Sequence, residues 1–332
     1  MEVITLDYGS GGKKTSALIE EMIVPLLDND ALRALGDGAV LQGAEKLAFS
    51  TDSFVVSPAF FPGGNIGKLS VCGTVNDVAM CGAEPKYLSL AFIIEEGFPM
   101  DDLRKIVSSI AETAKKAGVS VVTGDTKVVE RGKADGIYIN TAGIGYMRHN
   151  GLSPDRIEAG DAVILSGTAG DHGAAVMLAR NSELVQGELL SDCAPLNKLA
   201  ASLYGLGDSL KVLRDPTRGG VATTLCEFTE GRAFSIELQE KDIPVSEGVA
   251  AACDILGLDP LYCANEGKLL AVVKADAAEE ALERMRALPE GHNAAIIGKV
   301  TENHPGKLVL RTRFGGSRVL AKLAGDQLPR IC

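Results

Sequence analysis

Apolar side chains recur at helical spacing in two segments of the chain. In residues 16–27 they stand three and four positions apart, and in residues 101–117 the same spacing continues up to Gly118. Such spacing places the apolar side chains on one face, so both segments are predicted to be amphipathic helices. A glycine directly after the last periodic residue is typical of a helix end, and Gly118 is therefore expected to terminate the second helix.

Shorter apolar runs between the helical segments predict strands, at residues 47–50, 88–94, 119–122, 137–144, 162–165 and 269–273. Gly-Asp or Asn-Asp pairs stand at many of the junctions, as turn residues do. Alternation of this kind indicates an α/β or α+β protein. A polar stretch at residues 147–160 separates two halves, so we predict domains at residues 1–150 and 151–325, followed by a tail at 326–332.

Size, composition and charge narrow the class of protein. A length of 332 residues suggests about two domains, and 46% hydrophobic residues are enough to form a core in each. A formal net charge of -11 argues against a nucleic-acid-binding surface, which needs clustered lysine and arginine. No apolar run approaches the roughly 20 residues that span a bilayer, and the first residues lack the order of a secretory signal. We therefore expect a cytoplasmic, globular protein.

The seven cysteines favour reduced thiols. Their number is odd, and none stands in the C-x-x-C spacing of zinc or redox sites. Six of them, all except Cys332, stand mostly among apolar or small residues and are interpreted as buried structural cysteines. The four histidines show no metal-binding helical spacing, so any metal is expected to be held by oxygen ligands.

Cys332 is the last residue, at the end of a short tail that contains Pro329 and Arg330. A terminal side chain is expected to have few neighbours that could bury it, and seven extended residues would reach on the order of 23 Å. One hypothesis is a movable arm that carries a group on its thiol. The alternative is a chance cysteine at a frayed end. A prenylation motif is excluded because no residues follow the cysteine.

Four aspartates stand at the ends of apolar runs in the first half, namely Asp37, Asp52, Asp77 and Asp125. Carboxylate oxygens at strand ends suit Mg²⁺, which is usually bound through carboxylates together with substrate phosphates. If the four face a shared cleft, they predict a magnesium nucleotide site. Taken singly, each is more typical of a turn or helix-cap residue, and only the four together favour the metal site.

Two glycine-rich segments precede helices and could bind phosphate through backbone N–H groups. The first contains Gly11, Gly12 and Lys13 but lacks the spacing and hydroxyl residue of a Walker loop, and a plain N-terminal loop is the alternative. The second is residues 215–220, in which an arginine and two glycines lead into a predicted helix at 221–230. A helix cap with a surface arginine is the alternative there.

These segments together resemble one known family over nearly the whole chain. The motifs are Gly36-Asp37-Gly38-Ala39-Val40, Ser50-Thr51-Asp52-Ser53, Val75-Asn76-Asp77-Val78, Thr123-Gly124-Asp125-Thr126-Lys127, Asp215-Pro216-Thr217-Arg218-Gly219-Gly220, Asn265-Glu266-Gly267 and the ending Pro329-Arg330-Ile331-Cys332. They resemble the HypE family of hydrogenase maturation proteins, within the PurM-like (aminoimidazole-ribotide-synthetase-like) superfamily. The ending distinguishes this family from other members of the superfamily.

The resemblance implies an α+β, two-domain PurM-like fold and a homodimer whose cleft holds ATP. It implies an enzyme that uses ATP to dehydrate a carbamoyl group on its own terminal cysteine to a thiocyanate. The carbamoyl donor would be the carbamoyltransferase HypF, and the cyanide would pass to iron on the HypC–HypD complex for [NiFe] hydrogenase. A PurM-like kinase or synthetase acting on a free acceptor is the alternative enzyme, and a scaffold that docks a partner through Cys332 is the non-enzymatic one.

The resemblance also implies roles for individual residues. Cys332 would be the carrier, and Lys127 and Glu266 would transfer protons. Lys127 could instead contact phosphate, and Glu266 could instead bind metal or support a helix cap. Groups around Mg²⁺ would be Asp37, Asp77, Asp125 and Asp215. Groups around ATP would be Gly11, Gly12, Lys13, Asp52, Thr126, Arg218, Gly219 and Gly220.

Overall fold

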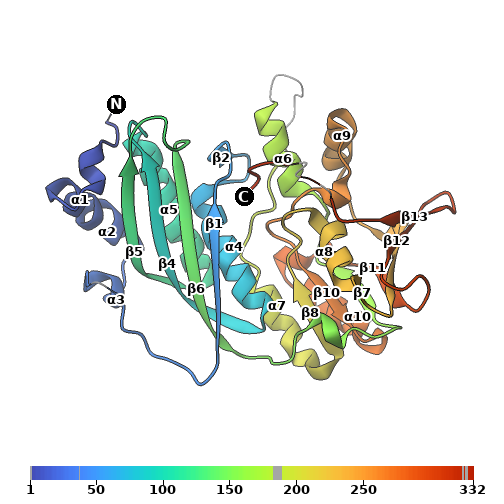
Figure 1. The fold of residues 1–332 in the computed structure, drawn as a ribbon. Coiled ribbons are helices and arrows are strands. Elements are labelled where there is room, and N and C mark those ends of the chain that lie inside the picture. Colours follow the sequence, from blue (N-terminus) through green and yellow to red (C-terminus); the bar gives the residue numbers. More distant parts are fainter. Residues whose placement is uncertain (1, 37, 182–188, 324, 326–327) are drawn as a thin grey trace.

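The computed structural model describes residues 2–36, 38–181, 189–323, 325 and 328–332, and it has two lobes, each built on one β-sheet (Figure 1). A four-stranded sheet forms the first lobe, and a seven-stranded sheet forms the second. Helices cover these sheets, which makes the architecture α+β. The sheet of the first lobe ends at Met147 and that of the second begins at Ala162, on either side of the polar stretch at 147–160.

The sheet of the first lobe has the strand order β1-β6-β4-β5. Strand β4 pairs parallel with β5, and the other neighbours are antiparallel. The strands are β1 (Leu47–Phe54), β4 (Ala83–Glu95), β5 (Ser120–Val129) and β6 (Ile137–Met147), beside a small pair β2 (Phe60–Phe61) and β3 (Gly64–Asn65). The helices are α4 (Ile66–Met80) and α5 (Met100–Ala117) behind the sheet, and α1 (Lys13–Ala17), α2 (Val24–Leu27) and α3 (Asp30–Arg33) near β5 (Figure 1).

Among the described residues, helices cover one face of this sheet. In β6 the odd-numbered residues from Ile137 to Gly145 are buried against the helices, while the even-numbered ones are half-buried on the other face. On that second face Leu47, Phe49 and Ile93 are 47%, 66% and 45% exposed. Alternating side chains of a strand point to opposite faces, so the chain presents one open sheet face with apolar side chains on it.

The two predicted helices are confirmed with shifted bounds. Residues 13–27 form a continuous helical run of α1, a π-helical segment (Leu18–Ile23) and α2. Helix α5 begins at Met100, and Gly118 ends it with a φ of 74°. Helix α4 was not predicted, because nearly all of its side chains are buried and its sequence therefore lacks amphipathic spacing.

The strand predictions found the right segments but several wrong ends. Strand β1 continues past its predicted end at residue 50 to Phe54, and strand β5 continues past its predicted end at residue 122 to Val129. Asp52 and Asp125 therefore lie within strands and not after the predicted strand ends, and Asp77 lies within α4. Polar residues inside an element resemble turn residues when the sequence is considered alone.

The sheet of the second lobe has the order β13-β12-β9-β11-β7-β10-β8. Its strands are β7 (Ala162–Leu165), β8 (Leu210–Arg214), β9 (Ser235–Gln239), β10 (Leu270–Val273), β11 (Ala295–Thr301), β12 (Leu308–Arg311) and β13 (Ser317–Leu320). The helices are α6 (Asp171–Arg180), α7 (Asn197–Leu203), α8 (Gly220–Thr229), α9 (Glu247–Leu256) and α10 (Ala278–Arg286). Strand β7 has the predicted bounds, and α8 begins one residue before the predicted helix.

Helix α4 joins the two lobes. The Asn76 side chain accepts a hydrogen bond from the N–H of Leu196 at 2.7 Å and donates to the carbonyl of Ala194 at 3.2 Å. The Tyr204 hydroxyl donates to the carbonyl of Ala79 at 2.7 Å. These bonds tie the last turns of α4 to the segment around α7, and Asp77 therefore lies at the junction of the lobes.

None of the seven cysteines, all of which lie in the described ranges, forms a disulfide. Five are buried and Cys332 is half-buried, but Cys81 is exposed at the C-terminal end of α4. The expectation of six buried structural cysteines is therefore wrong for Cys81. In the described ranges, no helix is both long and apolar enough to cross a membrane.

Candidate functional site

Three carboxylates meet at the junction of the lobes. Asp52 comes from β1, Asp77 from α4 and Asp215 from the loop between β8 and α8. Asp77 accepts a hydrogen bond from the Ser50 hydroxyl at 2.7 Å, and Asp215 is almost fully buried. The negative charge of Asp77 raises the pKa of both other carboxyls, so the three form one electrostatic cluster.

Burial is the main cause of the raised pKa of each carboxyl in this cluster. For Asp215, burial and the charges of Asp77 and Asp52 raise the pKa to about 7. Arg218 partly offsets the effect at Asp52 and Asp77. A desolvated group of carboxylates that repel one another favours a cation, and hard oxygen ligands suit Mg²⁺. Even so, the described residues contain no group of three or more His, Cys, Asp or Glu side chains placed to hold a metal ion.

The raised pKa of Asp215 predicts how stability depends on pH. The unfolded chain releases this proton near its ordinary pKa of 3.8, whereas the folded protein keeps it up to about pH 7. The folded state therefore binds more protons between these values, and the stability of the nucleotide-free protein should fall as pH rises, by at most about 1.4 kcal/mol per pH unit. Urea unfolding of wild type and Asp215→Asn between about pH 5 and 8 checks this. The variant should show a shallower slope, and parallel slopes would contradict the assignment.

Glu266 lies beside this cluster and is fully buried. Its Oε1 atom has no hydrogen-bond partner among the described residues. Burial, together with the negative charges around it, including those of Asp215, Asp192 and Asp52, raises the pKa of this carboxyl well above its usual range. A buried carboxyl of this kind can be protonated near neutral pH, and this property suits a group that transfers protons.

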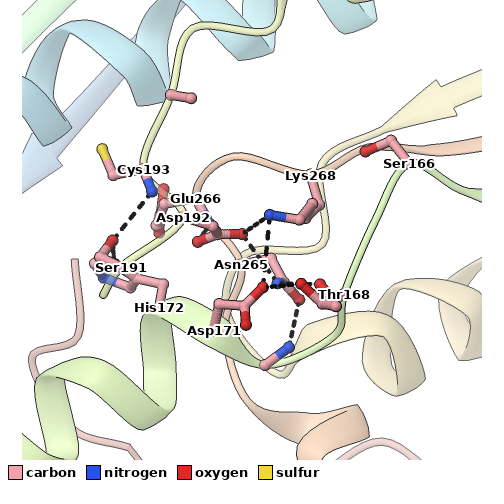
Figure 2. A network of polar contacts seen from close by, with 12 residues as sticks. Ser166, Thr168, Asp171, His172, Ser191, Asp192, Cys193, Asn265, Glu266 and Lys268 are labelled. Atoms are coloured by element: carbon pink, nitrogen blue, oxygen red, sulfur yellow. Dashed lines mark hydrogen bonds and ion pairs between the residues drawn. The ribbon is translucent and has the colours of Figure 1, made fainter. Parts of the chain in front are cut away.

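A buried polar network supports the loop that carries Glu266 (Figure 2). Asp192 accepts hydrogen bonds from the backbone N–H of Glu266 at 3.0 Å and from the Asn265 side chain at 3.0 Å. Lys268 pairs with Asp192 at 3.2 Å and with Asp171 at 3.5 Å. Burial opposes ionisation of Asp192, but Lys268 and the Glu266 N–H more than offset it and keep its pKa below the usual range. The network therefore holds the Glu266 backbone in one position.

Strand β5 carries three further predicted site residues away from the carboxylate cluster of the same chain, namely Asp125, Thr126 and Lys127. Asp125 stands in a row of cross-strand neighbours with Ala91, Asn140 and Ser53 on the open face, and Lys127 lies on the same face. Asp52 lies on the helix-covered face, because a side chain at Gly73 of α4 would come within 3.5 Å of its Oδ2. Three strand spacings also separate β1 from β5, about 14 Å. The hypothesis that Asp52, Asp77 and Asp125 share a cleft within one chain is therefore wrong for Asp125.

The residues on β5 have their own surroundings. Lys127 and Asp125 form an ion pair at 2.8 Å, and Lys127 holds the pKa of the Asp125 carboxyl below its usual range. Thr126 is buried and faces the helix side. Next to it is a cavity of about 180 Å³ between the N-terminal helices and strands β4 and β5, lined by Leu27, Leu32, Leu35, Phe92, Val121, Asp125 and Thr126 among others.

The second glycine-rich segment has the backbone of a phosphate-binding turn. Gly219 and Gly220 have φ angles of 76° and 60°, which favour glycine. A Cβ atom at Gly220 would lie 2.5 Å from the carbonyl oxygen of Cys263, so a larger residue cannot fit there. These glycines begin the ten-residue helix α8, and Arg218 lies beside the Asp52 and Asp77 carboxylates.

The first glycine-rich segment is simpler. Gly12 caps α1 and Lys13 is its first residue, while the N–H of Gly11 donates to the Thr15 hydroxyl at 3.0 Å. All three residues are exposed. Asp37, which was predicted as a metal ligand, lies outside the described residues.

The C-terminal tail is packed against the protein. Leu328 and Ile331 are 8% and 3% exposed, and Cys332 is half-buried. The N–H of Val55 donates to the carbonyl of Cys332 at 3.0 Å, and the N–H of Ser57 donates to that of Arg330 at 3.2 Å. The expectation that a terminal side chain would have few neighbours is therefore wrong. Val55 follows β1, so the tail docks on the order of 10 Å along the strand from Asp52.

Sequence reasoning missed the residues that hold the tail and the Glu266 loop. His172 and Arg180 lie on α6 and bond to tail carbonyls, and Asp192 and Lys268 bond around Glu266. Of these four residues, Lys268 alone stands close in the sequence to a predicted site residue, two positions after Glu266. The others come from segments whose separation in the chain gives no sign that they meet.

Known families match this chain over both lobes. The model of the AIR synthase related protein N-terminal domain matches residues 35–147, and that of the C-terminal domain matches residues 158–311. These matches, with the two sheets and the carboxylates between them, define the class as a two-domain AIR synthase related protein, and they confirm the predicted fold.

Relatives of similar length identify the branch within this class. "Carbamoyl dehydratase HypE" of Cupriavidus necator is 49% identical over 333 residues, 99% of this chain and 95% of that protein. The crystal structure of hydrogenase maturation protein HypE in complex with ATP has a TM-score of 0.94 at 46% identity, covering 98% of this chain and 99% of the other. HypE from a HypE–HypF complex has a TM-score of 0.80 at 50% identity, covering 92% and 100%. The chain belongs to the HypE family of hydrogenase maturation proteins.

Proposed function

We propose that this protein is an ATP-dependent carbamoyl dehydratase that acts on its own C-terminal cysteine during hydrogenase maturation. The relative from Cupriavidus necator is a carbamoyl dehydratase, and a solved relative binds ATP. The observation that carries the proposal is the docked tail. Cys332 is held next to the end of β1, on the same strand as Asp52 of the carboxylate cluster.

The reaction converts a thiocarboxamide on Cys332 into a thiocyanate. The amide oxygen attacks the γ-phosphorus of ATP, ADP leaves, and the oxygen then departs with phosphate while the nitrogen loses two protons. The net change is loss of the elements of water from the tail, which appear in ADP and phosphate. In its ionised form Glu266 accepts a proton from this nitrogen, because its carboxyl is buried, has an unpartnered oxygen and has a raised pKa that makes the carboxylate a stronger base.

Magnesium fits the carboxylate cluster by the chemistry of its ligands. Asp77 and Asp215 would hold the ion, with Asp52 and Arg218 beside the nucleotide phosphates. A bound magnesium ion would neutralise charge on the transferred phosphoryl group. Gly219 and Gly220 would offer backbone N–H groups at the beginning of α8. Roles for Asp37, Gly11, Gly12 and Lys13 stay predictions.

A homodimer would bring the residues of β5 to this site. The open sheet face of one chain carries the exposed apolar side chains Leu47, Phe49 and Ile93, and the ion pair of Asp125 and Lys127 lies on the same face. Apolar side chains on an open sheet face are typical of a surface that packs against a second sheet. If two open faces pack together, Asp125, Thr126 and Lys127 of one chain can serve the site of the other.

Complementation tests this shared site. Lys127→Met and Glu266→Gln are each expected to be inactive, because each removes one group from both sites of a dimer. After the two variants are mixed and their subunits exchange, random pairing should restore about a quarter of the wild-type sites. Dehydration activity of the mixture measures this, and two copies of the same variant, mixed as a control, should stay inactive. A mixture without activity, despite proven exchange, would contradict a site built from two chains.

The same Lys127 variant separates its two possible roles. If Lys127 contacts phosphate, Lys127→Met should weaken ATP binding, and Lys127→Arg should restore it. If Lys127 transfers a proton, ATP binding should be unchanged in both variants while dehydration is lost.

Partners follow from the reaction. A carbamoyl donor is required, and HypF is supported by the solved complex of a relative with it. The cyanide acceptor would be iron on a HypC–HypD complex. An acidic chain with free thiols suits the cytoplasm, where thiols are kept reduced.

Intact-mass measurement of the C-terminal peptide tests the function. The carbamoylated protein is incubated with magnesium and ATP, and loss of one water from the peptide ending in Cys332 is expected. ATP consumption with an unchanged peptide mass would sink the proposal and favour a kinase that acts on a free acceptor.

A further inference from the structure

Side chains of helix α6 bind the docked tail through the backbone carbonyl groups of the tail. The His172 Nε2 atom lies 2.8 Å from the carbonyl oxygen of Ile331, and the Arg180 guanidinium donates to the carbonyls of Pro329 and Arg330. Arg330 in turn donates to the carbonyl of Val55 at 3.0 Å. Because these bonds go to carbonyl groups, they hold the path of the tail whatever group is attached to the thiol of Cys332.

The directions of the hydrogen bonds around His172 follow from its neighbours. The Ile331 carbonyl can only accept, so Nε2 carries a hydrogen. Ser191 accepts a hydrogen bond from the N–H of Cys193 at 3.1 Å, and its hydroxyl lies 2.7 Å from His172 Nδ1. The imidazole is fully buried, and burial lowers its pKa, which favours the neutral ring. In that ring Nδ1 accepts from the Ser191 hydroxyl, so each hydrogen in this chain of bonds has one acceptor.

This chain of bonds leads to the loop that carries Glu266. Ser191 and Cys193 flank Asp192, whose carboxylate accepts from the N–H of Glu266 and from the Asn265 amide (Figure 2). The N–H of Ser191 donates to the carbonyl of Pro62 in the first lobe at 2.9 Å. A side chain at Gly63 would lie 2.8 Å from the Ser191 backbone, so this segment is closely packed between the lobes.

We propose that His172 is a positioning residue that couples docking of the C-terminal tail to the position of Glu266, through Ser191 and Asp192. When the tail leaves, Nε2–H loses its acceptor, and the imidazole that accepts the hydrogen bond from the Ser191 hydroxyl is no longer held in one orientation. When the tail docks, the segment at residues 191–193 is fixed, and with it the hydrogen bond that Asp192 accepts from the Glu266 backbone N–H. The acid–base group is thus set in place only when its substrate has arrived. The expected effect of this coupling on the dehydration rate rests on the proposed dehydratase function.

Two isosteric substitutions separate the two bonds of the imidazole. The side-chain amide of Gln reaches the place of Nε2, so His172→Gln keeps the bond to Ile331 and loses the bond to Ser191. The amide of Asn reaches the place of Nδ1, so His172→Asn keeps Ser191 and loses Ile331. Ser191→Ala removes the bridge without altering His172, and Ser202→Ala on α7 serves as a matched control far from the tail.

Hydrogen exchange measures docking and coupling without any turnover. The amides of Val55 and Ser57 report docking because they donate to tail carbonyls, and those of Cys193 and Glu266 report the coupled segment. In wild type, deletion of residues 328–332 should speed exchange at all four amides. His172→Asn should speed all four in the full chain, whereas His172→Gln should leave Val55 and Ser57 protected and speed Cys193 and Glu266.

The rate of water loss from the carbamoylated tail gives the functional readout. His172→Gln and Ser191→Ala should slow it by roughly fivefold or more, the change that one lost hydrogen bond of about 1 kcal/mol produces, with ATP affinity unchanged. Unchanged exchange at Cys193 and Glu266 after deletion of the tail would overturn the coupling, even if the substituted proteins fail to fold. A wild type that docks and couples its tail but loses no water would instead contradict the dehydratase function alone.

Discussion

Cys332→Ser is expected to abolish formation of the nitrile on the C-terminal peptide. The serine oxygen is a much weaker nucleophile toward a carbamoyl donor than a thiolate, so the tail would not be loaded. The fold should be unaffected, because the docked tail is held through the carbonyl of Cys332 and the buried side chain of Ile331, and neither changes. Intact mass of the peptide after treatment with carbamoyl donor, magnesium and ATP checks this, with no loaded or dehydrated product expected.

A second cysteine variant is the matched control for this experiment. Cys226→Ser lies on α8, where the Sγ donates to the carbonyl of Leu320, and a serine hydroxyl can keep that bond. Its tail should load and dehydrate like wild type. A carbamoyl group on any peptide other than the C-terminal one, or a nitrile in Cys332→Ser, would show that the reacting thiol is elsewhere.

Glu266→Gln is expected to reduce the first-order rate of dehydration by about 10²- to 10⁴-fold, the usual contribution of one positioned acid–base group. The amide has nearly the same shape, so the backbone bond from Glu266 to Asp192 and the packing of the loop should remain. Because glutamine cannot accept the proton from the thiocarboxamide nitrogen, the phosphorylated tail would form but not lose phosphate. Rapid-quench mass measurement of the tail, with ATP affinity measured separately, checks both parts.

The control for Glu266→Gln is Glu283→Gln, an exposed position on α10. It should show wild-type rates and ATP affinity. If Glu266→Gln dehydrates normally, the buried carboxyl is not the base. If it loses ATP binding in a magnesium-dependent way, the alternative role as a metal ligand is the better assignment.

How much of this site could be predicted depended on the kind of evidence each residue leaves in the sequence. Asp52, Asp77, Asp215 and Glu266 could be selected because they stand in motifs with a family resemblance, and the structure brings them together. Within one chain Asp125 is not grouped with them, because β5 continues past it and places it on the opposite face of the sheet. A one-residue shift in the pairing register changes which face a side chain occupies, and no single sequence reports that register.

The buried contacts of the tail were also beyond prediction. Pro329, Arg330 and Cys332 suggested a solvated arm, whereas Leu328 and Ile331 anchor the tail through apolar packing beside α6. Two apolar side chains in a short polar segment show no periodicity, so the surface that buries them can be found only from the fold. The same holds for His172, which acquires its role from a carbonyl 159 positions later.

The sequence by itself determined the local elements and the chemistry available. Periodic apolar residues specified α5, glycine ended it at Gly118, and the motifs supplied carboxylates, glycine turns and a terminal thiol. Tertiary structure decided which of these meet. Helix α4, buried on all sides, places Asp77 between the lobes, and the segment 191–193 joins the tail to Glu266. The physical reason is that electrostatic coupling and hydrogen bonding act over a few ångströms in space, whereas sequence patterns report neighbours along the chain.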